Sequence, residues 1–169
     1  MKANLLIRRF LWACSAVVLL AGLTGCPFNP PRDLTGSGMD MFCPITMRLH
    51  PLSRLTVSEG VGQLEAHVEF TDQMGDVTKG VGAVQVALFA YDDFAILTHK
   101  GRELGSWAFD LSTPQVNKAA WDPITRTYVL RRETPAGTAL PSGRQFVLSA
   151  TFTLPNGQSL QDDLLLKIK

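Results

Sequence analysis

Histidine, a common metal ligand and acid–base group, occurs three times in this 169-residue chain, at His50, His67 and His99. None of them has a Cys, His or Asp partner at a spacing typical of metal ligands. His67 alternates with Glu65 and Glu69, which predicts the solvated face of a strand, with a histidine–carboxylate metal site as the alternative. We expect no metal site, and we interpret His50 and His99 as loop or strand-end residues.

Paired carboxylates occur in three short stretches, Asp72/Asp76, Asp92-Asp93 and Asp162-Asp163. Loops at one end of a domain can gather such oxygens around Ca²⁺, but the spacing typical of an EF-hand is missing. Asp is also favoured in turns, where its side chain hydrogen-bonds the local backbone. We therefore interpret these pairs as turn residues, with a calcium site as the alternative.

Sequence patterns that activate a nucleophile or bind a phosphate are missing. Ser106 lacks the flanking residues of G-x-S-x-G, and the G-x-G at residues 80–82 is not followed by a predicted helix. We interpret Cys43 as a buried or half-buried thiol, with a disulfide between chains as the alternative. We therefore expect that the chain is not an enzyme, and that it has no catalytic residues and no cofactor site.

Four aromatic residues raise one binding alternative: Trp107, Phe109, Trp121 and Tyr128. Together they could form a platform for a sugar. Large aromatic side chains dominate burial in a small domain, so we expect at least half of them in the core.

Cys26 follows a segment that resembles a signal peptide, a position at which a cysteine can be modified covalently. It follows an uncharged apolar run of 14 residues, 10–23, which is preceded by Lys2, Arg8 and Arg9. As a helix this run spans about 21 Å, less than a transmembrane segment of about 20 residues would. The pattern is typical of a helical signal peptide, with a permanent membrane anchor helix as the alternative.

The residues at the end of this run, Leu23-Thr24-Gly25-Cys26, resemble the lipobox of bacterial lipoproteins. This resemblance covers residues 1–26. It implies that Cys26 is lipidated through its thiol, that the chain is cleaved before it, and that the new amino group is acylated, for example with palmitate. A protein with several acyl chains is held stably on a membrane. Because Pro27 rather than Asp follows, the outer membrane facing the periplasm is favoured over the inner membrane.

Composition limits the partners of the rest of the chain. The net charge is +1, and removal of three basic residues with the signal peptide leaves fewer basic than acidic residues. This argues against a nucleic-acid partner. Residues 27–38 hold three Pro and two Gly and form, in our interpretation, a tether that reaches roughly 35 Å. We divide the chain into a signal peptide (1–25), a lipidated flexible tether (26–44) and a β domain (45–169).

Alternation with a period of two dominates the β domain. Residues 63–71 and 145–154 are each predicted as a strand with one buried face. The predicted inward residues are Leu64, Ala66, Val68, Phe70, Phe146, Leu148, Ala150, Phe152 and Leu154. Ser149 and Thr151 face outward in this prediction. Pro155-Asn156-Gly157 predicts a hairpin to a last strand at 159–169, whose inward residues are Leu160, Leu164, Leu166 and Ile168.

Further strands are predicted at 46–55, 84–91, 104–111 and 124–132, and a weaker one at 95–99. The strand at 84–91 is apolar on both faces, which predicts a central strand covered on both sides. A short helix is expected between Thr113, as its cap, and Asp122-Pro123, which ends it.

Residues 70–86 are similar to the pattern V-x-D-x-x-G-x-x-v-x-G-…-V-x-V, and residues 140–148 to L-P-x-G-x-Y-x-L, with Phe146 in place of Tyr. The first stretch resembles a hairpin, and the second a strand entry, of bacterial immunoglobulin-like and transthyretin-like domains. We predict an all-β, immunoglobulin-like or transthyretin-like sandwich of about seven to eight strands with one short helix.

The expected function is that of a non-catalytic envelope lipoprotein, a structural or protein-interaction module whose partners are the membrane and another envelope protein. Candidate contacts are a sheet edge and the loop at residues 72–82. One alternative is a ligand- or carbohydrate-binding module. Another is a component like the type VI secretion outer-membrane lipoprotein. Residues 84–91 with Phe94 are similar to that family's central strand, although its Asn-Pro-Asp signature is missing.

Overall fold

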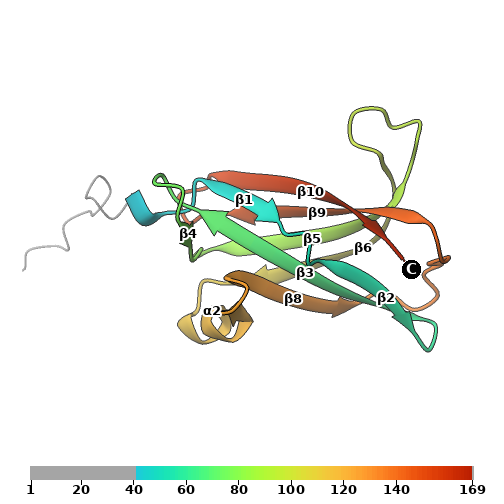
Figure 1. The fold of residues 1–169 in the computed structure, drawn as a ribbon, viewed down its shortest axis with the longest axis horizontal. Coiled ribbons are helices and arrows are strands. Elements are labelled where there is room, and N and C mark those ends of the chain that lie inside the picture. The colour runs from blue at the N-terminus through green and yellow to red at the C-terminus, as the bar shows by residue number, and fades with distance from the viewer. Residues whose placement is uncertain (1–40, 169) are drawn as a thin grey trace, which may run out of the picture. The chain divides into compact units, whose positions relative to one another are not determined.

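Two antiparallel sheets pack face to face in the computed structural model, which describes residues 41–168 (Figure 1). One sheet contains β1 (Thr46–Leu49), β2 (Arg54–Ser58), β3 (Val61–Thr71), β4 (Val77–Thr78), β7 (Trp121–Asp122) and β8 (Thr127–Glu133). The other contains β5 (Ala83–Tyr91), β6 (Lys100–Asp110), β9 (Gln145–Thr153) and β10 (Ser159–Lys167). Within the described range, β4 and β7 have two residues each and the other eight strands have four or more. The predicted all-β sandwich with one short helix is confirmed.

The long strand β3 organises the first sheet. β1 and β2 follow one of its edges in succession, while β8 pairs with the opposite edge. The single strand predicted over residues 46–55 is therefore wrong. Pro51 has no N–H to give to the ladder, and the backbone N–H of Ser53 instead closes a turn on the carbonyl of His50 at 2.9 Å.

The second sheet has the order β10-β9-β5-β6, so the strand predicted at 84–91 is central as expected. The prediction that both of its faces are covered is wrong. Val84, Val86 and Leu88 are buried, whereas Gln85 on the opposite face is exposed. The reason is that the sandwich has two layers, so the outer face of each sheet has no third layer over it.

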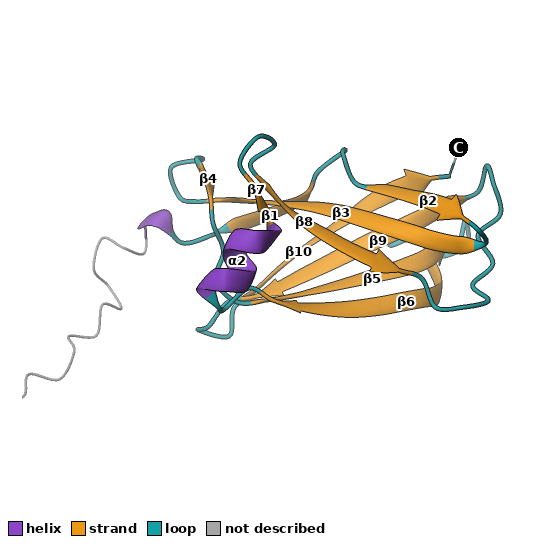
Figure 2. Cartoon of the chain, turned by 90° about the horizontal axis from the view of Figure 1, so that it is seen from below, coloured by secondary structure: helices purple, strands orange, loops and turns teal. Residues whose placement is uncertain are grey.

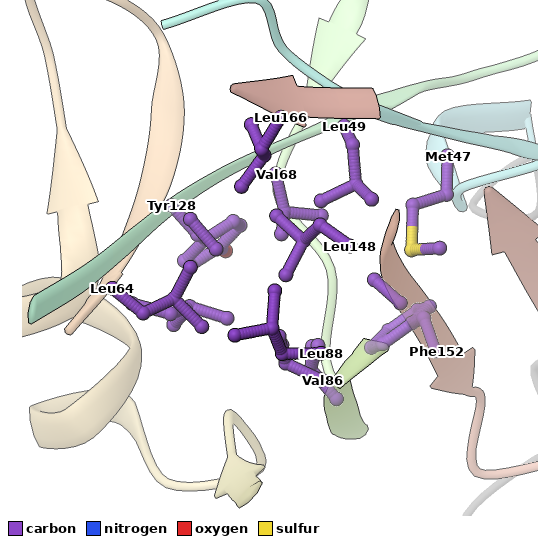
Figure 3. Packing of buried hydrophobic residues seen from close by; sticks show 14 of the residues in the cluster. Met47, Leu49, Leu64, Val68, Val86, Leu88, Tyr128, Leu148, Phe152 and Leu166 are labelled. Carbon is purple, nitrogen blue, oxygen red and sulfur yellow. The ribbon is translucent and has the colours of Figure 1, made fainter. Parts of the chain in front are cut away.

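The inward faces predicted for β3 and β9 form the core. Phe70, Tyr128 and Phe152 lie at its centre, with ring centroids 5.7 Å apart for Phe70–Tyr128 and 4.4 Å for Phe70–Phe152. Figure 3 shows aliphatic residues of both sheets converging around them, Leu148 and Leu88 among them. The β9–β10 hairpin is also confirmed, because Gly157, with φ +85°, closes its turn by donating to the carbonyl of Leu154.

The helix α2 (Pro114–Ala120) lies beside β7 and β8, at the end of the sandwich that also holds residue 41 (Figure 2). Thr113 occupies the N-cap position, but its side chain makes no capping hydrogen bond. The helix ends before Trp121, so Asp122-Pro123 does not end it. Asp122 instead begins the turn to β8, where its carboxylate accepts the backbone N–H of Ile124 at 2.9 Å.

Candidate functional site

The predicted lipidation site, Cys26, lies outside the described residues, so its chemistry stays a prediction from the sequence. Cys43 is exposed, which corrects the expectation of a buried or half-buried thiol. No helix in the range 41–168 is both long and apolar enough to cross a membrane.

The histidines do not form a common site. Between residues 41 and 168, no group of three or more His, Cys, Asp or Glu residues is arranged to hold a metal ion. His67 does not lie on a solvated face as predicted, because it is buried: its Nδ1 is 2.9 Å from Thr127 Oγ1 and its Nε2 is 3.3 Å from Glu65 Oε1. The β7–β8 turn brings Thr127 over this part of β3.

Glu65 is the centre of a charged cluster on the outer face of the first sheet. Its carboxylate is 2.7 Å from Arg131 Nε and 2.9 Å from Arg54 Nη2. Burial raises the pKa of Glu65, but hydrogen bonds from Arg131 and His67 and the charges of both arginines outweigh it, so the pKa lies below its usual value. Arg131 lies on β8, Arg54 on β2 and His67 on β3 itself. The cluster therefore connects three neighbouring strands.

Asp72 and Asp92 cap turns, as predicted, but the interpretation as turn residues is wrong for Asp162 and Asp163, which lie within β10. Asp72 is buried, and its Oδ1 accepts the backbone N–H groups of Met74 at 2.9 Å and Asp76 at 3.1 Å. Asp162 has a role that the sequence did not indicate, because its Oδ2 accepts the backbone N–H of Leu49 at 2.7 Å and so links the two sheets. Asp163 is 2.8 Å from Lys100 Nζ.

Ser149 provides a second correction on an outer face. It points outward as predicted, yet it is buried, because Lys100 extends across the sheet and donates to its Oγ at 3.0 Å. Lys100 also lies over the ring of Phe89, 5.6 Å from its centroid.

The four aromatic residues weighed as a sugar platform all pack toward the core. Tyr128 is fully buried, and Trp107, Phe109 and Trp121 are half-buried against the core. Arg132 covers Phe109 at 4.3 Å and Lys79 covers Trp121 at 5.1 Å. These side chains therefore do not form the exposed platform that a sugar site would need.

The candidate loop at residues 72–82 is held close to the body of the domain. Thr78 Oγ1 donates to the carbonyl of Phe42 at 2.9 Å, and Arg126 donates to the carbonyl of Val77 at 3.2 Å. Gly80 is buried, and a Cβ at this position would lie 2.9 Å from the ring of Phe152. The exposed residues of the loop are the tip at 73–76, Lys79 and Val81.

A groove of about 940 Å³ lies between β2 and β10, and we call it the edge groove. It is lined by residues 51–57, Leu140, Ser142 and residues 164–168. Leu55, Leu166 and Ile168 are buried, whereas Leu52, Val57 and Leu165 are about half exposed at the surface. Its lining combines apolar side chains with polar ones, and its charged residues are Lys167 and Arg54, the latter ion-paired to Glu65.

Both strands that border the edge groove are edge strands. In the described part of the chain, β2 forms a ladder only with β3, and β10 only with β9. The outward backbone N–H and C=O groups of β2 and β10 thus make no ladder with another strand. The neighbouring strand β1 differs, since the N–H of Leu49 is bound by Asp162. Sequence reasoning named a sheet edge as a contact but could not say which edge.

Comparison with known proteins gives little more. No family model matches the chain, and no curated protein matches it. Among solved structures, the crystal structure of wild-type OgpA from Akkermansia muciniphila has 12% sequence identity and a TM-score of 0.39. The match covers 70% of this chain and 27% of that chain, so this chain corresponds to well under half of OgpA. A likeness at this level carries neither fold nor function to this chain.

Proposed function

We propose that this chain is a lipid-anchored, non-enzymatic interaction module of the bacterial cell envelope that binds an extended segment of another envelope protein. The single observation that carries the proposal is the edge groove, which lies between two open sheet edges and has the buried Leu55, Leu166 and Ile168 in its lining.

An extended peptide is the ligand that fits this groove best. A strand laid along β2 or β10 would satisfy the unpaired backbone groups and extend one sheet, which is how strand addition gains affinity. Residues 164–168 cover about 17 Å as a strand, enough for a partner segment of about five residues. Alternate apolar side chains of that segment would fill the space between Leu55 and Leu166, and Arg54 and Lys167 favour an acidic flank.

The non-catalytic part of the proposal is supported by how the reactive side chains are used. His67 is held by Glu65 and Thr127, and Asp72 by the backbone of its own turn. Neither faces the edge groove, whose lining has no His, Asp, Glu or Cys.

The membrane part of the proposal rests on the lipobox-like residues 23–26. Lipidated Cys26 would hold the domain at the bilayer, and Pro27 favours the outer membrane facing the periplasm. Confinement to a surface raises the effective concentration of the domain near partners held at the same surface. A modest affinity in the edge groove would then be sufficient for function.

The test is site-specific photo-crosslinking in living cells. A photoreactive amino acid at Val57 or Leu165, which are about half exposed at the groove, is expected to capture one envelope protein. The matched control is Val116 on α2, which is 47% exposed and lies outside the groove. Capture from Val116 alone, or from none of the three positions, would contradict the proposal.

Charge substitutions at the rim check the same site, with the photoreactive amino acid moved to Leu52. Val57→Glu with Leu165→Glu is expected to abolish the crosslink from Leu52, because charges at the rim would have to be buried under the incoming segment. Both positions are exposed, so the domain should fold normally. Val116→Glu should leave the crosslink intact.

A further inference from the structure

The connection between β5 and β6, residues 92–99, carries an exposed apolar tip that the proposed partner site does not use. A weak strand was predicted at 95–99, and that prediction is wrong, because residues 93–98 form successive turns. Figure 1 shows this loop, in yellow-green, projecting beyond the sheets at the end of the domain away from residue 41. Phe94, Ile96 and Leu97 are 91%, 82% and 97% exposed.

We propose that this tip is a membrane-insertion loop that contacts the bilayer to which the domain is anchored. Single exposed apolar residues are common on protein surfaces. Three large ones within four positions on one projecting tip are different, because each gains free energy only when something removes it from water.

The loop is held in this shape by hydrogen bonds at its base. Asp92 Oδ1 accepts the N–H of Phe94 at 2.9 Å, and the N–H of Asp92 donates to the carbonyl of His99 at 3.0 Å. The backbone N–H of His99 donates to the carbonyl of Ala95. The imidazole ring of His99 stacks on the ring of Tyr91, with centroids 5.0 Å apart. The apolar side chains are thus directed outward by a defined turn, which lowers the entropy cost of insertion.

The shape of the tip favours a bilayer over a protein partner. The tip is convex, and residues 94–97 read Phe-Ala-Ile-Leu, with no polar side chain that could specify a partner. Polar residues stand at both legs, Asp92 and Asp93 on one and His99 and Lys100 on the other. An apolar tip above a polar base matches the change from hydrocarbon to headgroup in a membrane surface.

This inference rests on the proposed lipid anchor for its location, because that anchor keeps the domain near a bilayer. The tether predicted at residues 27–38 would reach roughly 35 Å if extended, enough for the domain to turn and bring its far end to the membrane. The loop projects from the end of the domain away from residue 41 (Figure 1), so insertion of the loop by a domain tethered through its N-terminal side would lay the long axis of the domain along the surface.

The test uses the lipidated full chain, reconstituted into vesicles of phosphatidylethanolamine and phosphatidylglycerol. An environment-sensitive fluorophore is attached at Leu97→Cys in a Cys43→Ser background. The matched control is Ile124→Cys, since Ile124 is 90% exposed but stands alone on another turn. At Leu97 we expect emission at shorter wavelength and quenching by nitroxide-bearing lipids, and at Ile124 neither. Equal, water-like emission at both positions would overturn the inference.

Two further measurements separate the possible outcomes. Mass spectrometry of the N-terminal peptide reports lipidation of Cys26, so loss of the anchor is distinguished from failure of the loop. If Cys26 is unmodified, the unlipidated chain is added to the same vesicles. Phe94→Ser, Ile96→Ser and Leu97→Ser together should then lower vesicle affinity by at least roughly tenfold for each side chain that inserts, and Ile124→Ser should not. Capture of a protein from Leu97 without a vesicle signal would overturn the bilayer in favour of a protein pocket.

Discussion

At the scale of single residues, Glu65 links three strands through charge. It lies on β3, receives Arg54 from β2 and Arg131 from β8, and shares His67 on its own strand. Its side chain is only 14% exposed, so solvent screens these interactions less than it screens a surface ion pair. The carboxylate is therefore held in its charged form, and the outer face of the first sheet gains order from it.

A pH-dependent loss of stability follows for Glu65→Gln. Because the pKa of Glu65 is lowered in the folded state, its contribution is complete above the pKa of the unfolded chain and is lost as pH falls through the folded pKa. The variant should unfold at lower urea concentration than the wild type at pH 7, and the difference should be smaller at pH 3. Glu103→Gln, on an exposed position of β6, is the control. An unchanged difference at both pH values would contradict this role.

Phe152 tests the assignment of the inward face of β9. It is fully buried and contacts Phe70. Its ring also lies so close to Gly80 and Gly82 that a Cβ at either position would be 2.9 Å from it. Phe152→Ala should lower the free energy of unfolding by about 3–5 kcal/mol because it leaves a cavity. Thr151→Ala, on the outer face of the same strand, should cost well under half of that, measured by urea unfolding. Equal shifts in the two variants would show that the face assignment is wrong.

At the scale of elements, the side chain of Asn117 attaches α2 to the sandwich through hydrogen bonds. Its Nδ2 donates to the carbonyls of Gly80 at 2.7 Å and Leu111 at 2.9 Å. Its Oδ1 accepts the hydroxyl hydrogen of Tyr128 at 2.8 Å. A seven-residue helix is too short to be stable alone, so this contact and its apolar packing hold it in place.

Asn117→Ala should therefore lower the free energy of unfolding by about 1–3 kcal/mol, because it leaves buried carbonyls and the Tyr128 hydroxyl with fewer partners. Lys118→Ala, the neighbouring exposed position on α2, should change it by less than about 0.5 kcal/mol. A double-mutant cycle with Tyr128→Phe should give a coupling energy of at least about 0.5 kcal/mol. Additive effects would mean that the Asn117–Tyr128 bond contributes nothing.

At the scale of the whole molecule, the sequence predicted the sandwich because alternation along β3, β9 and β10 reports directly which face is buried. Prediction of strands from the sequence failed where an apolar or alternating segment is interrupted by a turn. Residues 94–97 are apolar like a strand, but Asp92 turns the backbone instead. Residues 46–55 contain a strand pattern that Pro51 divides.

The site was less predictable than the fold, because it depends on contacts between distant segments. Ser149 is buried by Lys100 and His67 by Thr127, and no local pattern reports such pairs. The edge groove likewise exists only because the strand order leaves β2 and β10 as edges on the same side of the sandwich. Sequence alternation indicates which face of a strand is buried but not which strand is last in its sheet.

The proposed lipid anchor would confine the whole molecule to a membrane surface. Its presence can be tested independently of the fold. In cells given labelled palmitate, the wild-type chain should incorporate the label, and Cys26→Ala should lose it because the thiol that receives the lipid is gone. Cys43→Ser is the matched control, since it removes the other cysteine beyond the signal peptide and should retain the label. The Cys26→Ala chain should also keep its signal peptide, because cleavage at a lipobox follows lipidation. Undiminished label in Cys26→Ala would contradict the anchor, and with it the surface confinement that lets a weak groove bind a partner.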